Sequence, residues 1–245
     1  MTNATILEGY ISVEATLQAG NRPIEQVLIS DGKDRRDTGR LEKLAAERGV
    51  GVDRVTDAVI ASKATGRSHG GILALAGERS FLKLDNLLPQ TAAAFIVMLD
   101  GIEDPFNFGD AVRSLYAAGV DGIVVRPRNW LSAAGTVTRA SAGASEFVPM
   151  AVAQSANEAA MFFRRRGVAI ACTTDRGGQS IYEADLSVPL FLLIGGEKRG
   201  ITRSFRDAAD LRLNIPYQRD FRAAMSTGTA AAVIGFELMR QRQIA

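Results

Sequence analysis

Short apolar runs alternate with segments of helical spacing through the second half of the chain. The runs that predict strands are Ala94–Met98, Gly122–Val125, Val168–Cys172, Leu190–Ile194 and Leu213–Ile215, and the helical segments are Asn107–Ala118, Glu158–Arg166 and Thr229–Gln243. Short strands that are apolar on both faces and alternate with helices are typical of a parallel sheet covered on both sides. The pattern therefore predicts an α/β fold with a parallel sheet.

The first half of the chain mixes strand and helix signals on a smaller scale. Gln26–Ser30 is a β-prone run that stops at an Asp-Gly turn dipeptide, and Gly71–Ala76 is a second such run. Leu41–Arg48 has helical spacing and stops at a glycine. These segments predict a small α/β unit.

The stretch Leu84–Thr91 separates the two halves. It contains Pro89 and few signals of regular structure, so we expect a linker there, within a few residues. The predicted division is therefore a first domain over 1–88 and a second domain over 92–245.

The composition excludes several kinds of chemistry. With 245 residues, of which 47% are hydrophobic, the chain can bury a sizeable core. It has one cysteine, Cys172, and one histidine, His69, which excludes an intrachain disulfide and argues against a Cys/His metal site. A Ser-His-Asp triad would have to use His69, and no nucleophile motif lies near that residue. We therefore predict no metal site and no such triad.

The net charge of +2 is nearly balanced, but basic residues gather in two runs. Lys33, Arg35, Arg36 and Arg40 form the first run, and Arg164–Arg166 form the second. Each run is either a solvated face or a contact for RNA phosphates, and the sequence leaves both interpretations open.

No targeting or membrane segment is visible in the sequence. Met1–Glu8 has no basic flank followed by an apolar stretch, and apolar runs such as Leu190–Ile194 are far too short to cross a bilayer. We therefore expect a protein of the reducing cytoplasm with no membrane partner.

Three segments of unusual composition follow predicted strands, where open parallel sheets bind their ligands. The first contains an Asp104-Pro105 turn, then Asn107, a good helix cap, and then Arg113 along the helix. On local grounds alone, Asn107 could be only a cap and Arg113 only a surface charge.

The second segment begins with Gly195-Gly196-Glu197. Adjacent glycines after a buried strand let the backbone approach a ligand closely, although a plain strand-to-helix turn also uses glycine. The segment nearly fits the phosphate-binding pattern GxxxxGK(S/T), but Ile201 stands at the lysine position. We therefore exclude a nucleotide hydrolase, and the absence of GxGxxG after any predicted strand argues against a dinucleotide fold.

The third segment begins at Ile215-Pro216 and ends in the last predicted helix. Ser226 and Thr229 are both N-cap candidates, and the small residues Ala230–Ala232 would let that helix pack closely against a neighbour. Capping and tight packing alone would also explain these residues.

Taken in order, these segments resemble the SpoU-type RNA ribose methyltransferases of the SPOUT superfamily, over about residues 92–243. The first segment is similar to the family's D-P-x-N-x-G-x-x-x-R motif and the second to its G-x-E-x-x-G motif. The third motif is similar at Ile215-Pro216 and Ser226, and Ser141–Ala144 resembles the family's S-x-G-A stretch. Three motifs in register at predicted strand ends make a strong combined signal.

The first half is more weakly similar to the small ribosomal-protein-like α/β domain that often precedes this catalytic domain and grips structured RNA. Gly9, Val13, Leu17 and Arg67–Ile72 stand where that domain's recurring residues would. His69 is then structural or an RNA contact, and we favour the structural role.

The resemblance implies a fold and partners that the periodicity does not. The C-terminal parallel-sheet domain would contain a deep trefoil knot, although threaded chains are nearly absent among proteins in general. The chain would form a homodimer with its cofactor sites near the interface. Its substrate would be RNA, with folded ribosomal RNA favoured over transfer RNA.

The resemblance also implies S-adenosylmethionine as the cofactor and assigns the site residues. The residues that would hold the cofactor are Thr173, Ile194, Gly195, Gly196, Ile215, Met225 and Ser226. The catalytic residues would be Asn107, Arg113, Glu197 and Ser226. Arg113 would either remove the proton of a ribose 2′-hydroxyl or, because arginine normally stays protonated, orient a substrate phosphate.

One departure from the family pattern keeps other functions open. The third motif commonly reads S-L-N-x-S, whereas Gly228 and Ala230 stand at the asparagine and second serine positions here. An active ribose 2′-O-methyltransferase is favoured, and a catalytically silent RNA-binding module on the same scaffold is the alternative. A different α/β enzyme, such as a base methyltransferase, or a nucleotide-binding protein is the third possibility.

Overall fold

The computed structural model describes the chain except for residues 1–3, 90–92, 129–130, 176, 197–199 and 245. Contacts group the chain into two compact units, one within residues 1–80 and 129–147 and the other within 81–128 and 148–245. The predicted domains, 1–88 and 92–245, are continuous stretches, whereas each compact unit combines two separate stretches of the chain. The boundary between the two domains therefore stays a prediction.

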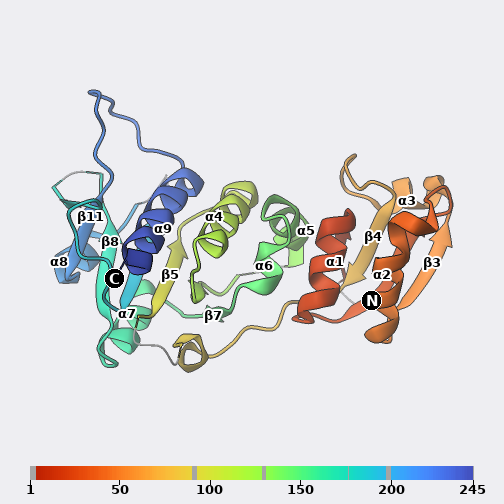
Figure 1. The fold of residues 1–245 in the computed structure, drawn as a ribbon, viewed down its shortest axis with the longest axis horizontal. Helices are drawn as coiled ribbons and strands as arrows, with labels where there is room; N and C mark the ends of the chain where they lie inside the picture. The colour runs from red at the N-terminus through yellow and green to blue at the C-terminus, as the bar shows by residue number, and fades with distance from the viewer. Residues whose placement is uncertain (1–3, 90–92, 129–130, 176, 197–199, 245) are drawn as a thin grey trace. The chain divides into compact units, whose positions relative to one another are not determined.

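The first unit is built on a mixed sheet with the strand order β1-β4-β2-β3 (Figure 1). β4 pairs antiparallel with β1 and β2, and β2 pairs parallel with β3. The elements of this unit are β1 Thr5–Glu8, α1 Tyr10–Ala19, β2 Ile24–Ser30, α2 Arg35–Glu47, β3 Gly51–Val55, α3 Asp57–Lys63, β4 Ile72–Ala76, α5 Leu131–Ala140 and α6 Ala144–Phe147. The predicted strands and helix of the first half therefore lie at β2, β4 and α2, and the prediction of a small α/β unit is confirmed.

A buried ion pair holds α6 within the first unit. The Glu146 carboxylate accepts hydrogen bonds from Nε and Nη2 of Arg22, at 2.9 and 2.8 Å, and from the Thr138 hydroxyl at 3.1 Å. The two charged side chains are 0% and 5% exposed. A charge buried this fully depends on its partner, because water cannot replace the lost contact.

The second unit is a parallel sheet of seven strands in the order β7-β6-β5-β10-β8-β11-β9. Its elements are the 3₁₀ helix η1 Leu84–Leu87, β5 Phe95–Asp100, α4 Pro105–Ala117, β6 Gly122–Val125, β7 Met150–Val152, α7 Ala156–Arg164, β8 Ala169–Thr173, β9 Gln179–Ser180, β10 Leu190–Gly195, α8 Arg203–Ala208, β11 Leu211–Asn214 and α9 Thr227–Ile244. The predicted parallel sheet is confirmed. The strand order alone does not test how the chain is threaded, so the trefoil knot stays a prediction.

Helices cover this sheet through apolar contacts. Phe163 of α7 is fully buried and stacks on Phe191 of β10, with ring centroids 5.0 Å apart. α4 and α9 pack against each other, as Figure 1 shows. In the described part of the chain, no helix combines the length and apolar character needed to cross a membrane.

Two local predictions were wrong, for identifiable reasons. The N-cap of α4 is Asp104, whose carboxylate accepts the Phe106 amide hydrogen at 2.8 Å, so Asn107 lies inside the helix. The predicted linker begins with a helical turn because Leu87, only 2% exposed, is part of the second unit's core. The leucines before Pro89, rather than the proline, determine the structure at the start of this stretch, because they pack on the core.

The substitution Glu146→Ala should lower the free energy of unfolding by about 3–5 kcal/mol, because it leaves the Arg22 charge buried without its partner. Glu47→Ala is the matched control, since Glu47 lies 3.9 Å from Lys43 in an exposed pair. That control should change stability by less than about 0.5 kcal/mol. Urea unfolding measures both variants, and equal losses would contradict a special role for the buried pair.

Candidate functional site

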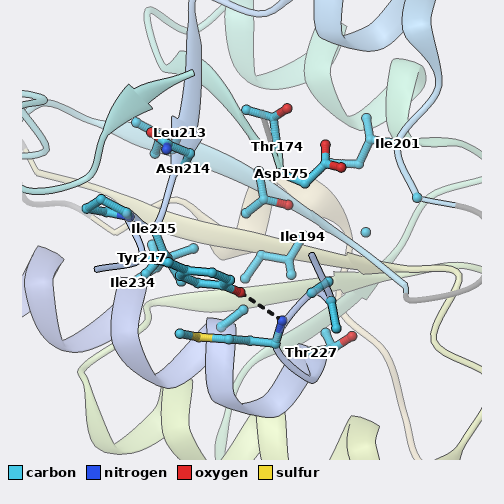
Figure 2. A pocket seen from close by; sticks show the side chains of 18 of the residues that line it. Thr174, Asp175, Ile194, Ile201, Leu213, Asn214, Ile215, Tyr217, Thr227 and Ile234 are labelled. Atoms are coloured by element: carbon cyan, nitrogen blue, oxygen red, sulfur yellow. Dashed lines mark hydrogen bonds between the residues drawn. The ribbon is translucent and has the colours of Figure 1, made fainter. Parts of the chain in front are cut away.

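A pocket of about 1010 Å³ opens at the carboxyl ends of β8, β10 and β11. Figure 2 shows residues of these strand ends facing it, with Ile194 from β10, Leu213 and Asn214 from β11, and Ile234 from α9. Open parallel sheets bind ligands at this edge, because the strand-to-helix loops there leave a crevice. The pocket therefore lies where the strand pattern predicts a ligand.

The pocket gathers most of the predicted cofactor residues. Those that line it are Thr173, Ile194, Gly195, Gly196, Ile215 and Met225. Ser226 is not part of the lining, although its two neighbours are. Ser226 is the N-cap of α9, since its hydroxyl oxygen accepts the Thr229 amide hydrogen at 3.2 Å, as the sequence predicts.

The two adjacent glycines serve contacts within the protein. A Cβ on Gly196 would collide with the Gly101 carbonyl oxygen, and one on Gly195 would come within 2.8 Å of Ile201 Cγ1. The Gly196 amide also donates to the Asp100 carbonyl at 2.7 Å. Gly196 therefore lets the loops after β5 and β10 close on each other, and Gly195 lets the loop after β10 approach the end of that strand. Both glycines also line the pocket, and their contact with a ligand stays a prediction.

An ion pair stiffens the end of β5 beside this contact. The Asp100 carboxylate pairs with Arg126 through two bonds, Nε to Oδ1 at 2.6 Å and Nη2 to Oδ2 at 2.7 Å. The hydrogen bond to Asp100 raises the pKa of Arg126 above its ordinary value, so Arg126 keeps its charge. Bidentate arginine–carboxylate pairs of this kind fix orientation as well as distance.

Of the four predicted catalytic residues, Asn107 and Arg113 lie on α4 and Ser226 directly precedes α9. Asn107 is half-buried in α4, and Arg113 is exposed further along the same helix. Neither residue lines the pocket. Glu197 lies outside the described residues. The structure therefore places Asn107 and Arg113 on the helix that packs against α9, whose first turn Ser226 caps.

Gly228 lies directly against the side chain of Asp110. A Cβ at this position would meet the Asp110 carboxylate where it now lies, at 3.0 Å from Cγ and 3.2 Å from Cβ, so a larger residue would require the exposed Asp110 side chain to turn aside. Asp110 precedes Arg113 by three residues, about 4.5 Å along the axis of α4. The missing side chain therefore lets the Arg113 helix come close to the start of α9, so the departure at Gly228 is consistent with an intact site.

Sequence reasoning missed several residues of the pocket wall, among them Asn214 and Tyr217. The Asn214 Oδ1 atom is buried and has no hydrogen-bond partner among the described residues. Buried acceptors are nearly always paired, so an unpaired one at a pocket wall suits a ligand that donates a hydrogen bond. The signal that could have found both residues is their place at the end of the predicted strand Leu213–Ile215, since Asn214 lies within it and Tyr217 follows it by two residues.

The remaining candidates for chemistry lie elsewhere. Cys172 is fully buried in β8, and burial raises the pKa of its thiol, so it does not supply a reactive thiolate. The Nδ1 atom of His69 accepts the Gly71 amide hydrogen at 3.0 Å, which supports a structural role for His69. In the described ranges, no group of three or more His, Cys, Asp or Glu side chains could hold a metal ion.

Comparisons with known proteins identify both halves of the chain. The model of the SpoU rRNA methylase family matches residues 94–236, and a model described as RNA 2′-O ribose methyltransferase substrate binding matches residues 6–82. The chain is 29% identical to the 23S rRNA (guanosine-2′-O-)-methyltransferase RlmB of Shewanella oneidensis, over 99% of this chain and 100% of that one. It is 26% identical to a putative TrmH family tRNA/rRNA methyltransferase of Staphylococcus aureus, over 97% and 96% of the two chains.

Solved structures show the same fold. The crystal structure of an RNA 2′-O ribose methyltransferase superposes with a TM-score of 0.80 at 25% identity and covers 99% of this chain and 90% of that one. The SpoU methyltransferase AviRb from Streptomyces viridochromogenes, in complex with the cofactor AdoMet, superposes with a TM-score of 0.81 at 20% identity, over 99% and 92% of the two chains. The second likeness supports the fold alone.

The substitution Gly196→Ala should lower the free energy of unfolding by about 1–3 kcal/mol, because the added methyl group meets the backbone of Gly101. Gly39→Ala is the control, since Gly39 lies in α2 and a Cβ there meets nothing within 4 Å. That control should be neutral or stabilising by up to about 1 kcal/mol. If Gly196→Ala proves as stable as the unmodified chain in thermal unfolding, the two loops are not in the contact described.

Proposed function

Because the chain belongs to the SpoU rRNA methylase family, we propose that it transfers a methyl group from S-adenosylmethionine to a ribose 2′-hydroxyl of ribosomal RNA. The new O–CH3 bond replaces the S–CH3 bond, which leaves S-adenosylhomocysteine, and the hydroxyl proton passes to water. The observation that carries this proposal is the pocket at the ends of β8, β10 and β11, inside the region that the family model covers. Six of the seven residues that the family resemblance assigns to the cofactor line this pocket. A silent RNA-binding module on the same scaffold is the second candidate, suggested by Gly228, but Asp110 gives that glycine a structural explanation.

The pocket fits the proposed cofactor. Its volume of about 1010 Å³ is at the top of the range of roughly 300–1,000 Å³ that is usual for small-molecule sites. The wall offers backbone groups of Ile194–Gly196 and Ile215 and the unpaired Oδ1 of Asn214. Bound S-adenosylmethionine supplies an electrophilic methyl group on a positively charged sulfur atom.

The protein's part in methyl transfer is alignment and substrate positioning. Holding the 2′-hydroxyl in line with the methyl group accounts for much of the rate enhancement. The entropy of aligning the two groups is then lost on binding and does not add to the activation free energy. Arg113 is exposed on α4, so its planar guanidinium is accessible for a bidentate contact with a substrate phosphate. Asn107 and Glu197 position Arg113 and the substrate, and Ser226 forms a hydrogen bond within the same site.

The first unit is the proposed RNA-binding part. Its basic run includes Arg35, Arg36 and Arg40, which are exposed in α2, and exposed cations of this kind neutralise RNA phosphates. The match of residues 6–82 to a substrate-binding model supports this assignment, as does its extent, close to the predicted domain of 1–88. We also propose a cytoplasmic location, because the proposed substrate is ribosomal RNA.

We also infer a homodimer formed through α4 and α9. These two packed helices expose Phe106, Tyr116 and Phe236, which are 55%, 43% and 45% accessible. Several large aromatic side chains on one pair of helices are typical of a protein interface. The second copy would cover rings that are otherwise in water.

Arg113→Ala should reduce methyl transfer by at least about 100-fold, because the proposed phosphate contact is lost. Calorimetric titration with S-adenosylmethionine should give a dissociation constant within about 2-fold of the original, because Arg113 does not line the pocket. Arg203→Ala, at an 88% exposed side chain in α8, is the control and should keep full activity. Normal turnover by Arg113→Ala would refute its role, and an unmodified chain that binds no cofactor would favour the silent module.

Phe236→Asp should convert the proposed dimer to a monomer, because a buried carboxylate without a partner opposes association. Met161→Asp, at a 54% exposed side chain of α7, is the control and should leave the dimer intact. Sedimentation at micromolar concentration measures both. A monomeric unmodified chain, or a Phe236→Asp variant that stays dimeric, would contradict this interface.

A further inference from the structure

One segment of the pocket rim has a composition that the cofactor does not explain. The chain between β11 and α9 runs as a long loop, drawn in blue in Figure 1, and carries Tyr217, Arg219, Phe221 and Arg222. All four residues line the pocket and are exposed, and the Phe221 side chain is 63% accessible. A phenylalanine left in water forgoes the burial of its apolar ring, so a ring kept exposed at a pocket rim suits a binding contact.

The base of this loop is anchored. The Met225 amide donates a hydrogen bond to the Tyr217 hydroxyl at 3.0 Å, the dashed line in Figure 2. This bond occupies the polar end of Tyr217 and ties the start of the loop to its end. The Tyr217 and Phe221 rings lie 6.1 Å apart at 42°, so two aromatic rings stand together on the rim.

The charges around the rings indicate an anionic partner. The described pocket lining carries Arg206, Arg219 and Arg222 against two carboxylates, Asp175 and Asp220. Aromatic rings beside arginines are the arrangement that binds single-stranded nucleic acid, because the rings stack on bases and the cations meet phosphates. A purely apolar partner would gain nothing from these arginines.

The two rings differ in their distance along the chain from the residues that would hold the cofactor. Tyr217 follows Ile215 by two residues and its hydroxyl accepts the Met225 amide hydrogen, whereas Phe221 stands in the middle of the loop, between Ile215 and Met225. A base bound at the rim would bring its own ribose to the mouth of the same pocket.

We propose that Tyr217 and Phe221 form a stacking platform for one unpaired base of the RNA, with Arg219 and Arg222 meeting the adjoining phosphates. The platform selects a nucleotide that is out of a helix, because a paired and stacked base does not present its face. This inference rests on the proposed function and adds which part of the site holds the substrate base.

The first test measures binding without activity. Fluorescence anisotropy with a labelled single-stranded RNA oligonucleotide, in the presence of S-adenosylhomocysteine, should show about 10-fold weaker binding by Phe221→Ala. Phe221→Trp should restore most of the affinity because it keeps a stacking ring. Tyr182→Ala, at a 55% exposed ring outside the pocket lining, is the matched control and should bind like the unmodified chain.

Salt dependence separates stacking from charge. The double variant Arg219→Gln with Arg222→Gln should reduce the slope of log affinity against log salt by about 1.4, since each phosphate contact to single-stranded RNA contributes roughly 0.7. Phe221→Ala should lower the affinity at every salt concentration and leave the slope unchanged. A fully paired RNA duplex should bind Phe221→Ala and the unmodified chain equally.

Three outcomes would overturn the platform. The first is that Phe221→Ala binds RNA as tightly as Tyr182→Ala does. The second is that Phe221→Ala loses as much affinity for S-adenosylmethionine as for RNA. The third is that Phe221→Ala converts a dimer to a monomer. The last two would assign the ring to the cofactor or to a second copy of the chain. Failure of the proposed function is distinct, because the unmodified chain would then methylate no ribose in 23S rRNA transcribed without modifications.

Discussion

The close backbone contact between the loops that follow β5 and β10 is the constraint on which the site depends. Gly196 lies against Gly101 so tightly that no side chain fits between them, and the Gly196 amide bonds to the Asp100 carbonyl at 2.7 Å. β5 and β10 are adjacent parallel strands, so this contact sets where their carboxyl ends and the following loops lie. A second tight contact, between Gly228 and Asp110, brings α4 to the start of α9. Together the two contacts join the helix that carries Arg113 to the loops that enclose the pocket.

This construction explains why the site uses so few buried charges. The pocket is walled by strand ends and backbone groups, and the arginines of its described lining lie in α8 and in the loop after β11. Such an arrangement suits a reaction in which the cofactor supplies the reactive group and the protein supplies alignment. It also allows a nearly neutral chain, with a net charge of +2, to bind RNA through local groups of cations.

Much of the fold could be predicted because β5, β6, β8 and β10 are apolar over almost their whole length and are therefore buried. The two-residue β9 is too short to leave a periodic signal. The predicted cofactor residues meet in the pocket because parallel strands place their carboxyl ends together. The partners of Gly196 and Gly228 could not be predicted, because each lies more than ninety residues away in the sequence and only the folded sheet brings it near. For the same reason, the position of Phe221 on a pocket rim could not be read from the sequence.

The most direct test of the account is the position of the transferred methyl group. The purified chain would be incubated with methyl-labelled S-adenosylmethionine and 23S rRNA transcribed without modifications, and the digested nucleosides would be identified by mass spectrometry. The account predicts label in a 2′-O-methylated nucleoside, at one nucleotide of the RNA. Label on a base, or no label from a chain that binds the cofactor, would contradict it.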